Sequence, residues 1–74
     1  MTPTVLLYVR PDCPHCDALR AALAARGAAV TAIDVAKQKA RVPELLKLTG
    51  GRRIVPVMVE NGVVTVAPHG GTTF

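Results

Sequence analysis

Two cysteines separated by two residues, Cys13 and Cys16, are the clearest candidates for chemistry in this sequence. A thiolate attacks disulfides, whereas an ordinary cysteine thiol, with a pKa of ~8.5, is mostly protonated at neutral pH. Cys13 follows an apolar stretch and precedes Pro14, a residue favoured at the first position of a helix. The amides and the dipole of such a helix stabilise an anion at Cys13. The spacing therefore predicts thiol–disulfide exchange, with Cys13 as the attacking residue.

The neighbours of Cys13 have roles that suit this chemistry. Cys16 lies about one helical turn further on, so it can displace a substrate bound to Cys13, and we expect it to be the less exposed thiol. Pro14 stiffens the turn between the two cysteines. Arg10 adds positive charge from the preceding loop, and His15 does so when it is protonated. We expect the protonated His15 to stabilise the thiolate and so to raise the reduction potential.

Two other interpretations of the cysteine pair stay open. A C-x-x-C pair supplies half of many zinc sites, but the second pair of ligands is missing, because only His15 and His69 are available. A structural disulfide between residues so close together closes no long loop. We therefore predict no metal site. His69 lies in a segment rich in proline and glycine, which favours a solvated loop histidine over a site residue.

The flanking residues predict a β-α-β unit. Residues 4–9 form a near-continuous apolar run, typical of a central strand buried on both faces and paired in parallel. A helix is expected from Pro14 to Arg26, ending at Gly27. Residues 29–35 form the second strand, and a strand, a helix and a parallel strand make a right-handed crossover.

The rest of the chain predicts a helix and a hairpin. The helix begins at Pro43, because proline would break a longer one, and ends at Gly50. Strands at 56–60 and 63–67 flank Asn61-Gly62, a type I′ turn signal. This turn places Val57 opposite Val66 and Val59 opposite Val64, and we expect the face with these four valines to pack on a helix. The prediction is one α/β domain over residues 1–74, in the order β-α-β-α-β-β.

Composition excludes several classes of protein. With 74 residues, the chain has room for one thin core. Two cysteines are too few for a disulfide scaffold. The sequence contains neither an apolar run of ~20 residues for a membrane span nor a secretory signal, so we expect a cytoplasmic protein. A net charge of +4 with 3% aromatic residues favours a solvated basic surface over nucleic-acid binding.

Over residues 4–67 the chain resembles the glutaredoxins, a branch of the thioredoxin fold. The resemblance implies a four-stranded mixed sheet and a cis peptide bond before Pro56, and it assigns Cys13 the attacking role and Cys16 the resolving role. It also implies that the Val55 backbone pairs with the substrate, and that Arg10 and Arg52 line the site of a glutathione carboxylate. The matching residues are Leu7 to Cys16, Ile33-Asp34-Val35, Leu48 to Arg53, Val55-Pro56 and the hairpin that follows.

The function implied is that of a dithiol oxidoreductase that reduces protein disulfides or glutathione mixed disulfides. It binds no cofactor, uses glutathione as co-substrate, and is returned to its reduced form by glutathione or a flavin-dependent reductase. One alternative is a glutathione-independent, thioredoxin-like electron donor. Another is a non-catalytic module that uses the C-x-x-C to bind metal or a sheet face to dock a partner.

The sequence departs from the glutaredoxin pattern in three places. His15 replaces an aromatic residue, often tyrosine, and the resulting Cys-Pro-His-Cys is better known from strongly oxidising thioredoxin-fold proteins. Gly70-Gly71 comes late and no acidic residue follows it, although the family holds the γ-glutamyl end of glutathione there. The family's C-terminal helix is missing, which predicts an uncovered sheet face and a possible homodimer. The tail is also similar to that of a small glutaredoxin-like family called UXX-star, in which selenocysteine can occupy the first redox position.

Overall fold

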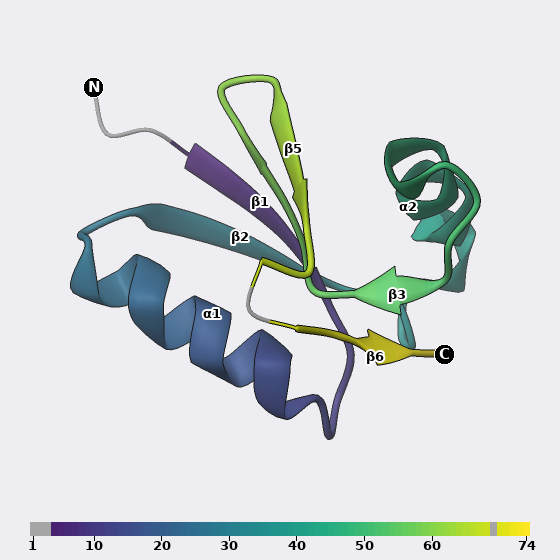
Figure 1. Ribbon diagram of the computed structural model, residues 1–74, viewed down its shortest axis with the longest axis horizontal. Helices are drawn as coiled ribbons and strands as arrows, with labels where there is room; N and C mark the ends of the chain where they lie inside the picture. The colour runs from purple at the N-terminus through teal and green to yellow at the C-terminus, as the bar shows by residue number, and fades with distance from the viewer. Residues whose placement is uncertain (1–3, 69) are drawn as a thin grey trace.

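The computed structural model describes residues 4–68 and 70–74, and it forms a mixed sheet with one helix on each side (Figure 1). The predicted order β-α-β-α-β-β is present, with an additional short helical turn and two additional short strands. The elements are β1 (Thr4–Val9), α1 (Pro14–Ala25), β2 (Ala29–Asp34), a 3₁₀ turn (Lys39–Arg41), α2 (Val42–Thr49), β3 (Ile54–Val55), β4 (Val57–Glu60), β5 (Val63–Val66) and β6 (Thr72–Thr73).

The four-stranded sheet has the order β2-β1-β4-β5, with β1 at its centre. β1 pairs with β2 in parallel and with β4 in antiparallel orientation, which confirms the mixed sheet. The hairpin register is the predicted one, with Val57 opposite Val66 and Val59 opposite Val64. The local turn signal at Asn61-Gly62 was therefore sufficient to define the pairing of β4 with β5.

α1 begins, and both helices end, at residues that favour these positions. Pro14 is the first residue of α1, and Gly27 follows its last turn with a φ of 77°. Leu19 and Leu23, four positions apart, are the buried leucines of α1, so one face of the helix packs on the sheet. Gly50 ends α2 in the left-handed conformation, at a φ of 71°.

Apart from helix and strand ends that shift by one residue, the structure differs from the prediction at the start of α2, at β3 and at β6. α2 begins at Val42, one residue earlier than expected, because Pro43 is tolerated within the first turn of a helix. β4 begins at Val57 rather than at Pro56, and Ile54–Val55, which precede the predicted strand, form the additional strand β3. β6 was not predicted, and it pairs with β3 in a separate two-stranded sheet.

The apolar face of the hairpin is covered only in part, so the expectation that it packs on a helix was too broad. Val57 is fully buried and Val59 is half-buried, but Val64 is 37% exposed. α2 lies beside β3 rather than over the tip of the hairpin (Figure 1). Val63, on the opposite face, is 64% exposed. None of the helices in residues 4–68 and 70–74 is long and apolar enough to cross a membrane.

Candidate functional site

Cys13 caps the N-terminus of α1 with its own sulfur. The Cys13 Sγ accepts a hydrogen bond from the Cys16 backbone amide at 3.3 Å, as predicted for a thiolate at the start of this helix. The two side chains are equally buried, with Cys13 2% exposed and Cys16 1% exposed. Both thiols are therefore buried, and on the Cys13 side β6 contributes to this burial through Thr72, whose Oγ1 lies 3.6 Å from the Cys13 Sγ.

The two thiols differ in acidity. Burial raises the pKa of Cys13, but hydrogen bonds from Cys16, from Thr72 and from the helix amides outweigh it, so the net pKa is below the ordinary value. Burial, together with the hydrogen bond to Cys13, raises the pKa of the Cys16 thiol to about 12. Within the pair, Cys13 is therefore the thiol that ionises first, and Cys16 stays protonated beside it.

Thr72 is the residue that the sequence analysis missed. Its Oγ1 lies 3.6 Å from the Cys13 Sγ, and it belongs to β6, which runs beside β3 near the first turn of α1 (Figure 1). The β-branched pair Thr72-Thr73 is the sequence signal for this strand, but two residues after Gly70-Gly71 give no periodicity.

Val55 and Pro56 lie beside this contact. The Val55–Pro56 peptide bond is cis. Val55 faces Thr72 in the antiparallel β3–β6 pair, and Ile54 faces Thr73. The backbone edge of Val55, expected to be free for a substrate, is therefore occupied by a strand of the protein itself.

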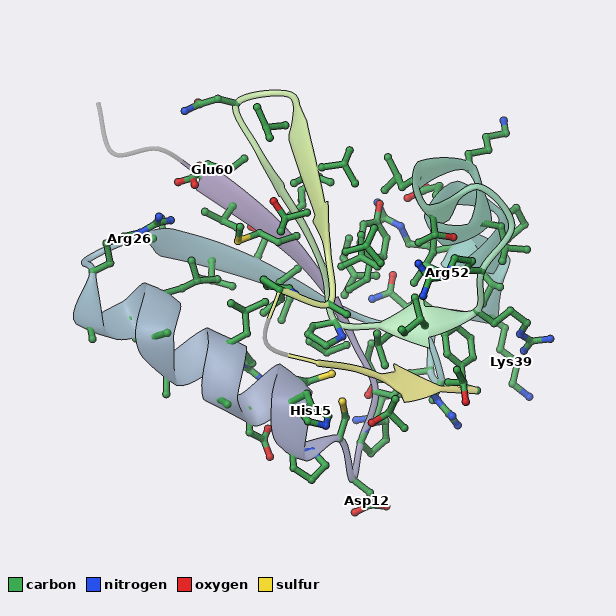
Figure 2. The ribbon with its side chains drawn as sticks, in the orientation of Figure 1. Asp12, His15, Arg26, Lys39, Arg52 and Glu60 are labelled. Atoms are coloured by element: carbon green, nitrogen blue, oxygen red, sulfur yellow. The ribbon has the colours of Figure 1, made fainter. Side chains whose placement is uncertain are left out.

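His15 and Pro14 lie on the same side of the site as the cysteines. Pro14 is exposed, and His15, at the N-terminal end of α1, is half-buried (Figure 2). The His15 ring packs closely against Gly70: an added Cβ at Gly70 would lie 3.1 Å from the ring. His15 thus contacts the segment that leads into β6.

Arg10 and Arg53 both lie against the Phe74 ring, whereas the resemblance names Arg10 together with Arg52. The guanidinium groups of Arg10 and Arg53 lie 5.1 and 5.0 Å from the centre of the Phe74 ring. These three residues and Lys39 line a cleft of about 500 Å³. Arg52 is instead on the α2 side of β3 in Figure 2, and its backbone is bound to the Thr49 hydroxyl at the end of α2.

The structure offers no obvious metal centre in the part of the chain that it describes. Among those residues, no group of three or more histidine, cysteine or acidic side chains is placed to hold a metal ion. Cys13 and Cys16 are both free cysteines. The interpretation of His69 as a solvated loop residue lies outside the described residues.

A solved structure of a thioredoxin-like protein has a similar fold. The fold is similar to the crystal structure of a mutant of the thioredoxin-like protein BC3987, with a TM-score of 0.74 and 29% sequence identity, over 84% of this chain and 82% of that chain. A C-x-x-C at the start of α1, within this arrangement, defines a thioredoxin-fold protein of thiol oxidoreductase type.

The family follows from the sequence match. The glutaredoxin family model matches residues 5–65, and the chain belongs to the glutaredoxin family. This result confirms the resemblance and the fold class. A search of curated proteins gave no match.

Proposed function

We propose that this glutaredoxin-family protein is a dithiol oxidoreductase in which Cys13 attacks and Cys16 resolves. The observation that carries the proposal is the difference between the two thiols at one helix terminus. The Cys13 Sγ receives the Cys16 amide at 3.3 Å and has a lowered pKa, whereas the pKa of Cys16 is raised to about 12. A lowered pKa suits the attacking thiol, because the thiolate is the nucleophile. A raised pKa suits the resolving thiol, because it keeps Cys16 protonated until the mixed disulfide on Cys13 has formed.

The reaction proceeds in two exchanges. The Cys13 thiolate attacks one sulfur of a substrate disulfide, a new Cys13–substrate bond forms, and the other sulfur leaves as a thiolate that takes a proton from solvent. Cys16 then loses its proton and attacks the Cys13 sulfur, which releases the reduced substrate. The substrate disulfide is reduced by two electrons, and the two cysteines are oxidised to a Cys13–Cys16 disulfide. An external reductant then restores both thiols.

Protein disulfides and glutathione mixed disulfides are the proposed substrates, in the cytoplasm. Glutathione or a flavin-dependent reductase is the proposed electron donor. The Arg10–Arg53 cleft supports a carboxylate-bearing substrate, because Lys39 adds a third cation to the lining. We propose no bound cofactor, no nucleic acid and no membrane as partners.

The glutathione-independent electron donor remains the second candidate, and a specific observation favours it. Arg52, which the resemblance assigned to glutathione, lies away from the cleft that Arg10 lines, and Gly70-Gly71 is not followed by an acidic residue. Two contacts expected for glutathione are therefore unmatched.

The test combines the activities of two cysteine variants with the reduction potential of the wild-type protein. The Cys13→Ser variant should lose all disulfide exchange, while Cys16→Ser should accumulate mixed disulfides that are visible by mass. Equilibration of the wild type in glutathione buffers gives the reduction potential. A value of roughly −200 to −230 mV with a glutathione adduct supports the glutaredoxin reaction, and one near ~−270 mV without an adduct supports the second candidate. Full activity of Cys13→Ser would overturn the proposal.

A further inference from the structure

The Thr72 hydroxyl connects the nucleophile to β6, because its Oγ1 lies 3.6 Å from the Cys13 Sγ. We propose that this contact makes β6 a redox-sensitive latch. The Thr72 hydroxyl holds β6 closed over Cys13 in the reduced protein and releases it when Cys13 and Cys16 form a disulfide, and it thereby raises the reduction potential of the pair. This inference rests on the proposed oxidoreductase function, because it requires that disulfide to form.

In the reduced protein, β6 is held by contacts along its length. Its two residues face the two residues of β3 in an antiparallel pair. The Phe74 amide donates to the Arg53 carbonyl at 3.1 Å, and the Phe74 ring lies 5.1 and 5.0 Å from the guanidinium groups of Arg10 and Arg53. A two-stranded pair is marginal on its own, so the closure of β6 depends on such side-chain contacts.

The contact with Cys13 is the one that depends on the redox state. A threonine hydroxyl both donates and accepts, so Thr72 accepts from the Cys13 thiol and donates to its thiolate. A hydrogen bond to an ionised partner is roughly twice as strong as one between neutral groups. Burial raises the pKa of Cys13, and the hydrogen bond from Thr72 is one of those that lower it below its ordinary value. The contact is therefore strongest with the reactive form of the sulfur.

Formation of the Cys13–Cys16 disulfide weakens this contact. The substrate disulfide is cleaved, one S–S bond joins the two cysteines, and their two electrons and two protons end on the two substrate thiols. The Cys13 sulfur then carries neither a proton nor a negative charge, so it cannot donate to Thr72 and accepts only weakly. In the disulfide form, β6 therefore keeps its pairing with β3 and the contacts of Phe74 but loses its hold on the nucleophile.

The redox state and the position of β6 affect each other by linkage. Because the reduced state closes β6 more firmly, closure of β6 stabilises the reduced state by the same factor. A more stable reduced form makes a stronger oxidant, so the Thr72 hydroxyl raises the reduction potential. The latch thus covers the thiolate while no substrate is bound, and it opens the disulfide form to the reductant.

Amide hydrogen exchange tests the latch in the wild-type protein. The Phe74 amide bonds to the Arg53 carbonyl when β6 is closed, so its exchange rate reports the opening of this strand. We expect it to exchange about fivefold faster in the disulfide form than in the reduced form at the same pH. The Gly51 amide, which bonds to the Leu46 carbonyl at 2.7 Å, is the internal control and should exchange at the same rate in both forms.

Equilibration in glutathione buffers tests the effect on the potential. Thr72→Val keeps the shape but loses the hydroxyl, so the equilibrium should shift about fivefold toward the disulfide, which is ~21 mV in the negative direction. Thr72→Ser keeps a hydroxyl and should restore the wild-type equilibrium. Thr73→Val is the matched control, because Thr73 is exposed and faces Ile54 in the strand pair. In Thr72→Val, the Phe74 amide should exchange at equal rates in the two redox forms.

The outcomes distinguish the latch from the proposed function. Equal exchange of the Phe74 amide in the reduced and the disulfide form of the wild type would overturn the latch, and this measurement requires no variant to fold. An equal shift of the equilibrium in Thr72→Val and Thr73→Val would also overturn it. In both cases the Cys13–Cys16 disulfide still forms, so the oxidoreductase function stands. A protein that forms no such disulfide at any glutathione ratio would overturn the proposed function itself.

Discussion

The Thr72 hydroxyl and the Cys13 sulfur lie 3.6 Å apart, although 59 positions separate the two residues in the sequence. The contact has two consequences with opposite effects on reactivity. As a donor to the thiolate, Thr72 lowers the pKa of Cys13. As part of β6, it also covers the sulfur, so the same residue makes the nucleophile more acidic and less accessible.

Replacement of Thr72 by valine should separate these effects. Thr72→Val keeps the β-branched shape but loses the hydroxyl, so the thiolate loses one hydrogen bond and the pKa of Cys13 should rise. The measurement is the pH profile of Cys13 alkylation by iodoacetamide, whose midpoint should move upward toward ~8.5. Thr73→Val is the matched control, since Thr73 faces Ile54 and is exposed.

A midpoint that moves equally in the two threonine variants would show that the hydroxyl of Thr72 has no particular role. The same result would assign the low pKa of Cys13 to the helix amides and Cys16 alone. A rise confined to Thr72→Val supports the geometry described above, whatever the change in absolute rate.

The acidities of the two cysteines predict which of them reacts first. The pKa of Cys13 is lowered, so its alkylation rate should increase with pH and level off below ~8.5. The pKa of Cys16 is raised to about 12 by burial and by Cys13, so it should stay unmodified at pH 8. Peptide mapping of protein treated at pH 8 checks this, and preferential labelling of Cys16 would reverse the assigned roles.

Gly71 gives a steric test of how β6 is held. An added Cβ at this position would lie 2.8 Å from the Val55 carbonyl and 2.9 Å from side-chain atoms of Ala67 and Ile54. Gly71→Ala should therefore separate β6 from β3, cost about 1–3 kcal/mol of unfolding free energy, and increase the alkylation rate of Cys13.

Gly62→Ala is the control for the Gly71 variant. It has a φ of 76° and nothing within 4 Å of an added Cβ, so it should cost about 1 kcal/mol through backbone strain alone. Its alkylation rate should equal that of the wild type. An increase in both variants would mean that global destabilisation, rather than release of β6, exposes the thiol.

The parts of the site that could be predicted from the sequence depend on local signals. Pro14 placed Cys13 at a helix start, and Asn61-Gly62 set the register of β4 with β5. The role of Arg53 could not be predicted in this way, because neighbouring residues on an extended chain point to opposite faces. Arg53 rather than Arg52 lines the cleft with Arg10, and the backbone bond between the Phe74 amide and the Arg53 carbonyl holds Arg53 beside the Phe74 ring.

β6 escaped prediction for a different physical reason. Its partner, β3, lies far away in the sequence: Val55 and Thr72, which face each other, are 72 − 55 = 17 positions apart. A two-residue strand has no period to read, and its pairing depends on tertiary contacts such as the Thr72–Cys13 contact and the Phe74 ring between two guanidinium groups. The functional consequence of this segment is therefore visible only in the folded chain.

Glu44 should make stability depend on pH. Its carboxylate accepts hydrogen bonds from Arg41 at 3.1 and 3.2 Å and from the Tyr8 hydroxyl at 2.9 Å, and these hold its pKa below the ordinary value, with Arg41 as the larger cause. A group with a lowered folded pKa contributes stability above its unfolded pKa of ~4.3 and loses that contribution as pH falls through the folded value. The wild type should therefore lose more of its urea midpoint between pH 7 and pH 3 than Glu44→Gln does.

The Arg41→Gln variant completes this test because it removes the larger cause while it leaves the carboxylate in place. Its loss of urea midpoint on acidification should be smaller than that of the wild type and larger than that of Glu44→Gln, since the Tyr8 hydroxyl still donates to Glu44. Equal losses in all three proteins would mean that the Tyr8–Glu44–Arg41 group does not couple α2 to the sheet in solution. A graded series would show that the link between Tyr8 of β1 and Glu44 of α2 is electrostatic.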